Sequence, residues 1–134
     1  MDNPSMLSHV SLGTNDLNRA LAFYDPVMAA IGARRLVEHD EAVAYGRAYP
    51  EFWINTPLDD GKATVGNGTH LAFAASNRAE VDAFYKAAVE AGAEPDGAPG
   101  PRPEYGEPFY GCFVRDPDGH KIEATFWDTS MEGQ

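Results

Sequence analysis

The sequence has 134 residues, the length of one ordinary domain and too short for two independent ones. Hydrophobic residues make up 43% of the chain and charged residues 23%, which excludes a disordered or collagen-like chain. The formal net charge of −11 would repel nucleic acid and anionic membrane surfaces, so we expect neither as a partner.

The cysteine content and the hydropathy pattern favour a cytoplasmic protein. The single cysteine, Cys112, excludes a disulfide framework within the chain and is typical of a reducing compartment. The first six residues have no basic stretch followed by an apolar one, so we expect no secretory signal peptide. No apolar run approaches the roughly 20 residues that a membrane-spanning helix needs.

The first half of the chain predicts a strand, a helix and three further strands. Residues 7–14 form a short strand-like run, and Asn15 or Asp16 is suited to cap the helix that follows. Gly32 is expected to end this helix, and Pro26 is expected to kink or break it. The strands expected after the helix are residues 34–38, 42–47 and 52–55.

The second half repeats this plan. Residues 69–75 predict a strand, Ser76 or Asn77 a helix cap, and Gly92 the end of the second helix. Strands are expected at residues 110–115 and 121–127, joined by a hairpin turn at residues 116–119. Two segments are expected as loops, residues 57–68 and the proline-rich residues 94–108, and the second is the expected lid of a site.

An internal echo relates the two halves. When His9 is aligned with His70, residues 9–12 face residues 70–73, and a Phe-Tyr pair in each helix faces its counterpart. We therefore predict two β-α-β-β-β modules in a single domain spanning residues 1–134. The expected parts are module one at about 6–56, a linker at about 57–67 and module two at about 68–128.

Three potential metal ligands occupy related places in this plan. His9 and His70 fall on the first strand of each module, and Glu123 falls on the last strand. Two imidazoles and a carboxylate suit a divalent ion of the iron, manganese, nickel or zinc group and leave coordination positions open. His39 and His120 are expected at the surface, outside this ligand set.

These motifs resemble the vicinal oxygen chelate superfamily. The carriers of the resemblance are the double module pattern, the two His motifs and the closing run Asp-Pro-Asp-Gly-His-Lys-Ile-Glu at residues 116–123. The resemblance covers about residues 6–128, and the superfamily includes glyoxalase I, extradiol dioxygenases, fosfomycin-resistance thiol transferases and bleomycin-binding proteins. It implies an α+β fold in which the modules form a curled mixed sheet around a metal-binding cleft.

The same resemblance implies a ligand set and an assembly. His9, His70 and Glu123 take the places of three ligands of one divalent metal, whose identity stays open among Zn, Ni, Mn and Fe. When residues 52–55 are aligned with residues 122–125, Trp53 takes the position of Glu123, so the carboxylate that glyoxalase I supplies from its first module is missing. Whether Glu51, on the same strand face as Trp53, acts as a fourth ligand stays open. Members of the family usually form dimers with sites at the interface, so we expect a homodimer.

The expected function is that of a metal-dependent, glyoxalase-like lyase or isomerase acting on a small oxygenated metabolite. In this hypothesis Glu123 is also the expected catalytic residue, and either Glu123 or a metal-bound water moves the proton. The aromatic side chains that could line the substrate pocket are Tyr45, Trp53, Tyr105 and Tyr110. The alternatives are an Fe(II) extradiol-type dioxygenase and a non-enzymatic drug-binding protein of the bleomycin-resistance kind. A phosphonate substrate is disfavoured because Arg47, Arg102 and Arg115 are the few local cations.

Overall fold

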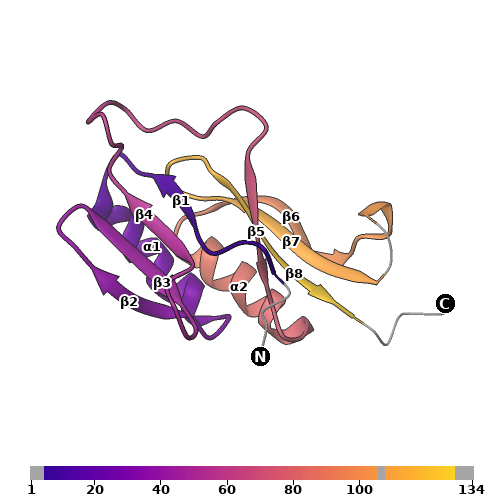
Figure 1. Cartoon of the computed structure of the whole chain (residues 1–134). Helices are drawn as coiled ribbons and strands as arrows, with labels where there is room; N and C mark the ends of the chain where they lie inside the picture. Colours follow the sequence, from indigo (N-terminus) through magenta and orange to yellow (C-terminus); the bar gives the residue numbers. More distant parts are fainter. Residues whose placement is uncertain (1–4, 106–107, 129–134) are drawn as a thin grey trace.

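The computed structural model describes residues 5–105 and 108–128, and these form two modules of the same topology (Figure 1). Module one contains β1 (Val10–Gly13), α1 (Leu17–Ala29), β2 (Arg34–Glu38), β3 (Ala42–Gly46) and β4 (Phe52–Asn55). Module two contains β5 (His70–Ala74), α2 (Arg78–Glu90), β6 (Glu94–Pro101), the short 3-10 helix η1 (Pro103–Tyr105), β7 (Phe109–Arg115) and β8 (Lys121–Trp127).

Each module has its own four-stranded mixed sheet. The strand order is β1-β4-β3-β2 in the first sheet, here called sheet A, and β5-β8-β7-β6 in the second, sheet B. In each sheet the first strand pairs in parallel with the last, and the other pairs are antiparallel. The predicted α+β fold of two β-α-β-β-β modules is therefore confirmed, with two sheets that do not close on each other.

The helices begin where the sequence places a capping residue. The Asp16 side chain accepts a hydrogen bond from the Arg19 amide, and the Asn77 side chain accepts one from the Glu80 amide. Each of these bonds satisfies an amide that has no partner within the helix. Helix α1 runs on through Pro26, so the predicted break is wrong. The proline lies in the last turn, and the buried Val27 and Met28 that follow it anchor that turn in the core.

The proline-rich segment forms a strand where the sequence predicts a loop. Strand β6 pairs only with β7, and its register shifts on both sides of Gly97, whose φ is +156°. An edge strand needs amide donors on one side only, so it accommodates Pro95, Pro99 and Pro101. This strand completes the second module. The N-terminal strand is shorter than predicted, and His9 lies one residue before β1.

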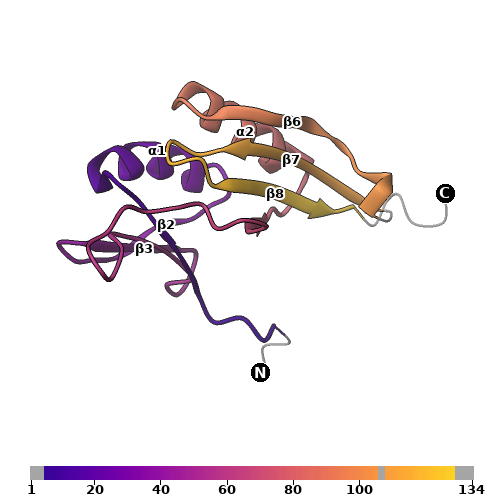
Figure 2. The ribbon, with the colours of Figure 1, turned by 90° about the horizontal axis from the view of Figure 1, so that it is seen from above.

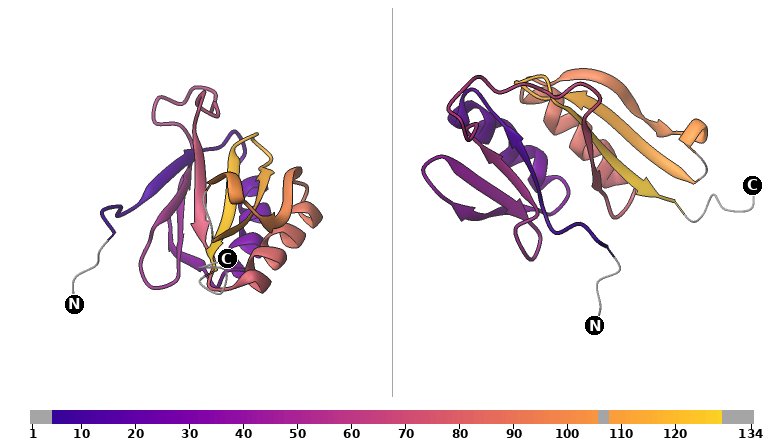
Figure 3. Two further views of the ribbon diagram at one scale, coloured as in Figure 1. Left: turned by 90° about the vertical axis from the view of Figure 1, so that its right-hand side faces the viewer. Right: turned by 45° about the horizontal axis from the view of Figure 1, so that its top comes forward.

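Helices α1 and α2 pack against each other where the two modules meet, and one apolar core serves both modules (Figure 2). Helix α1 packs on sheet A and α2 on sheet B (Figure 3). Aromatic contacts continue the core from one module to the other, because the rings of Phe52 and Phe73 lie 4.9 Å apart. Among the described residues, no helix is long and apolar enough to cross a membrane.

The predicted hairpin turn between β7 and β8 fastens module two to module one. Asp118 accepts hydrogen bonds from the Thr14 hydroxyl at 2.6 Å and from the Arg19 guanidinium at 2.8 Å. Asp116 accepts one from the Tyr24 hydroxyl at 2.6 Å. His120 is 4% exposed, with its Nε2 atom 2.7 Å from the carbonyl oxygen of Gly13, so the prediction of a surface histidine is wrong. The turn therefore fixes how the two modules sit together.

Candidate functional site

The open face of sheet B forms a cavity of about 370 Å³, called here the sheet B cavity. Side chains alternate across a strand, so on β8 Ile122 and Ala124 are fully buried on the face toward α2, while Glu123 faces the cavity. The residues that line the cavity come from β5, β6–η1, β7 and β8. They are His70, Ala72, Arg102, Phe109, Phe113, Lys121, Glu123 and Thr125.

Two of the three predicted ligands meet in this cavity. Strands β5 and β8 run in parallel with His70 opposite Lys121 and Ala72 opposite Glu123. This register brings the Nε2 atom of His70 to 3.5 Å from the Oε1 atom of Glu123. The Glu123 side chain is 12% exposed and that of His70 is 49% exposed. Burial raises the pKa of Glu123, and the positive charges of His70, Lys121 and Arg102 oppose that rise.

A glycine keeps the space beside Glu123 open. Gly111 lies opposite Thr125 in the pairing of β7 with β8. A Cβ atom added at Gly111 would lie 3.5 Å from the Oε2 atom of Glu123 and 3.1 Å from the Ala124 carbonyl oxygen. Sequence reasoning missed this residue, although a glycine inside an apolar strand is a signal of close approach or of a site. It also missed Lys121, which lies two residues before Glu123 and therefore on the same face of β8.

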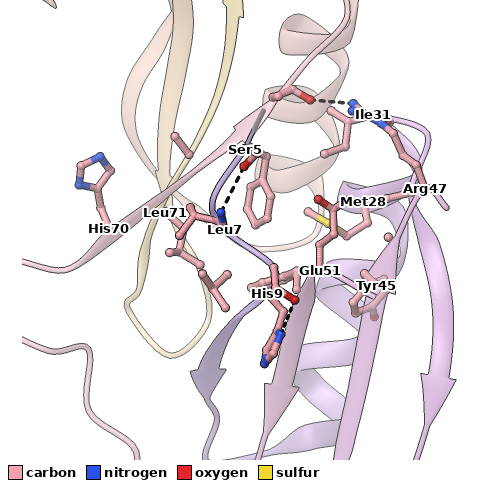
Figure 4. Close-up of a pocket in the computed structure, with 18 residues that line it drawn as sticks. Ser5, Leu7, His9, Met28, Ile31, Tyr45, Arg47, Glu51, His70 and Leu71 are labelled. Carbon is pink, nitrogen blue, oxygen red and sulfur yellow. Dashed lines mark hydrogen bonds between the residues drawn. The ribbon is translucent and has the colours of Figure 1, made fainter. Parts of the chain in front are cut away.

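His9 lies on a different cavity, the groove of about 560 Å³ between the modules (Figure 4). It directly precedes β1 beside Glu51, and its Nδ1 atom lies 3.0 Å from the Ser8 hydroxyl. His9 and His70 line this groove from opposite sides, and their rings point away from each other (Figure 4). Within residues 5–105 and 108–128, no three His, Cys, Asp or Glu side chains come close enough to hold a metal together.

The predicted aromatic residues lie at separate places. Tyr45 is 1% exposed, donates a hydrogen bond to Asp25 at 2.7 Å and contributes to the groove between the modules. Tyr110 is not among the residues lining the sheet B cavity, and its hydroxyl donates to Asp82 on α2 at 2.8 Å. The backbone of Tyr105 belongs to η1, and its side chain lies outside the described part of the structure.

The strand register places Trp53 where module two has Glu123. Trp53 lies opposite Ser11 on β1, and Glu123 lies opposite Ala72 on β5. Ser11 and Ala72 correspond when His9 is aligned with His70, so the two strand pairs give the same correspondence as the sequence repeat. The indole of Trp53 stacks on the ring of His39, with their centroids 6.3 Å apart. Module one therefore presents an aromatic ring at this place.

Comparison with known protein families assigns this fold to one of them. Residues 6–124 match the family described as the Glyoxalase/Bleomycin resistance protein/Dioxygenase superfamily. The chain belongs to this superfamily. A structure of a glyoxalase/bleomycin resistance protein from Albidiferax ferrireducens T118 is 36% identical, with a TM-score of 0.85 over 91% of this chain and 99% of that one. The predicted resemblance is thereby confirmed.

Two further proteins are similar to this chain at lower sequence identity. The metallothiol transferase FosB of Shouchella clausii (strain KSM-K16) is 28% identical over 119 residues, which cover 88% of this chain and 77% of that protein. A family enzyme from Burkholderia phytofirmans PsJN is 20% identical, with a TM-score of 0.71 over 92% of this chain and 100% of that one. The second likeness concerns the fold alone.

Proposed function

We propose that the protein is a metal-dependent, glyoxalase-like lyase or isomerase that acts on a small oxygenated substrate. The observation that carries the proposal is the pair formed by His70 and Glu123, whose Nε2 and Oε1 atoms lie 3.5 Å apart. Two ligand atoms bound tetrahedrally to one zinc ion at about 2.1 Å are about 3.4 Å from each other. The imidazole and the carboxylate therefore suit a shared divalent ion in both chemistry and spacing.

The third ligand in this proposal is His9 of a second copy of the chain. Strands β1 and β5 each lie at the edge of their sheet, and unpaired strand edges favour pairing with another chain. The diverging rings of His9 and His70 in one chain support a ligand that comes from elsewhere (Figure 4). A two-fold symmetric homodimer would create two equal sites, each with two imidazoles and one carboxylate.

When bound, a divalent metal stabilises the negative charge that develops on two chelating substrate oxygens. The proton transfer is assigned to Glu123. Glu123 is the one carboxylate among the described residues that line the cavity, so it is the side chain placed to take a proton from the carbon next to a carbonyl group and to return it. The rings of Phe109 and Phe113 give the same cavity an apolar wall.

Trp53 restricts which reaction is expected. It stands at the register position of Glu123, so module one offers no second carboxylate as a fourth ligand there. We therefore expect weak or absent activity on the hemithioacetal of methylglyoxal and glutathione. A second candidate is metal-dependent transfer of a thiol to an electrophilic substrate, which the similarity to the metallothiol transferase FosB favours. Assays with and without an added thiol separate the two reactions.

Metal loading tests the proposal. The purified protein is incubated separately with zinc, nickel, manganese and iron(II), desalted and subjected to elemental analysis. We expect about one metal per chain for the parent and loss of the metal in the His70→Ala and Glu123→Gln variants. The matched control is His39→Ala, which removes an exposed histidine outside the ligand set. A parent without metal, or a His70→Ala variant that retains it, would contradict the proposal.

A further inference from the structure

We propose that Arg102 and Lys121 bind an anionic group of the substrate, so that the substrate class is a small molecule bearing a carboxylate, phosphonate or phosphate group. Both side chains line the sheet B cavity together with His70 and Glu123. The inference rests on the function proposed for that cavity, although the binding of an anion requires only the two cations. It goes against the expectation that the chain lacks cations for such a substrate.

Among the described residues, neither Arg102 nor Lys121 forms a salt bridge with a carboxylate. The chain has 21 acidic residues against 10 lysines and arginines, so ion pairing is readily available. Five arginines of the described chain form salt bridges with carboxylates: Arg19, Arg35, Arg47, Arg78 and Arg115. Within the described residues, Arg102 and Lys121 form none, although both are half-buried. Glu123 is the one carboxylate of the described residues in the same cavity and forms a salt bridge with neither cation, so a bound anion would supply the close ionic contact that both lack.

Both cations contact the ring of Phe113. The guanidinium carbon of Arg102 lies 5.5 Å from the ring centroid of Phe113, and the Nζ atom of Lys121 lies 4.9 Å from it. An oxyanion bound in the cavity would be attracted by both of these charges. Both charged groups border the volume that a substrate would fill.

The backbone of β6 holds the side chain of Arg102 in place. Its guanidinium donates hydrogen bonds to the carbonyl oxygens of Ala98 and Pro101. A Cβ atom at Gly97 would lie 3.4 Å from Nη2 of Arg102 and 3.0 Å from the Phe113 ring, so the glycine leaves room for both groups. A guanidinium has five N–H donors, and those not used by the two carbonyls remain for an oxyanion. Such a preorganised donor binds with little loss of side-chain entropy.

The charge of the whole cavity favours an anion over a cation. Glu123 is the one carboxylate among the described residues that line it. With that carboxylate bound to a divalent metal, two positive side chains and the metal leave the cavity strongly positive. A cationic drug, the ligand of the bleomycin-binding alternative, is disfavoured in such a cavity. The volume of the sheet B cavity, about 370 Å³, suits a small molecule.

Titration calorimetry tests the inference with the probes inorganic phosphate, methylphosphonate and oxalate. The proteins are the parent, Arg102→Gln, Lys121→Gln and the control Lys86→Gln, which removes an exposed lysine on α2. We expect the parent and the control to bind at least one probe, and each site variant to bind it at least about tenfold more weakly. The Arg102→Lys variant should recover part of the affinity. The rank order of the probes distinguishes a carboxylate from a tetrahedral phosphorus oxyanion.

Metal content is measured in the same samples, and each titration is run on metal-loaded and chelator-treated protein. If the site variants bind metal and the probes as the parent does, the anion site is refuted and the proposed function survives. If the parent holds no metal but still loses phosphate binding on Arg102→Gln, the proposed function fails and the anion site stands. A parent that binds none of the probes in the millimolar range overturns the inference.

Discussion

A mixing experiment with two inactive variants tests whether the metal site is shared between two chains. His9→Ala removes the proposed ligand of module one, and His70→Ala removes the one of module two. The His9 residue is exposed and the His70 side chain is 49% exposed, so neither substitution disturbs the core. Each variant alone should form a folded dimer without a complete site.

A mixed dimer regains one complete site. The chain carrying His9→Ala contributes an intact His70 and Glu123, and the chain carrying His70→Ala contributes an intact His9. The second site of that dimer lacks both histidines. Random assortment of equal amounts makes about half of the dimers mixed, so about one quarter of all sites should be complete. Metal per chain should therefore rise from near zero to about one quarter of the parental value.

The assay is elemental analysis after the variants have been unfolded together, refolded, loaded with zinc and desalted. Different affinity tags on the two variants show by co-purification that mixed dimers have formed. If mixed dimers form and bind no more metal than the separate variants, the shared site is refuted. A monomeric mass by light scattering at high micromolar concentration would refute it as well, and so would full metal binding by His9→Ala alone.

Three further predictions concern the hairpin turn that joins the modules, the fourth ligand absent at Trp53, and the ion pair between Asp25 on α1 and Arg35 on β2. Asp118→Ala removes the nearer of the two acceptors of the buried Thr14 hydroxyl and the carboxylate partner of Arg19, so the free energy of unfolding should fall by about 2 kcal/mol in urea denaturation, and an unchanged midpoint would contradict this role. Trp53→Glu should rebuild a fourth ligand and raise zinc affinity at least about tenfold in competition with a chelator, and an unchanged affinity would argue against the register comparison. Although partial burial opposes it, the hydrogen bonds from Arg35 and Tyr45 lower the pKa of Asp25. The stability that this carboxylate adds is therefore present above its unfolded pKa of about 3.9 and is lost as the pH falls through the folded value. Asp25→Asn should lower the free energy of unfolding by about 0.5 kcal/mol at pH 7 and leave it unchanged near pH 2. Thermal unfolding of both proteins across this pH range checks the sign.

The repeat in the sequence was sufficient to predict the fold of two β-α-β-β-β modules. A separate alignment of residues 52–55 with residues 122–125 set Trp53 at the position of Glu123, and the pairing of each last strand with the first strand of its module gives the same correspondence. The cavity itself was less accessible to prediction. Lys121 and Gly111 matter through neighbours on adjacent strands, and their own sequence context is that of an ordinary strand.

The sequence by itself determined the two β-α-β-β-β modules, the capped helices and the hairpin turn at residues 116–119, because these depend on local periodicity and capping. Only the tertiary structure decided that the proline-rich segment is an edge strand, since β7 supplies its one row of partners. It also decided that His120 is buried, because the hairpin turn packs onto β1. Most of all, it decided that His9 and His70 lie apart within one chain. The distance between two strand edges depends on how whole modules pack, and no pattern along a single strand records it.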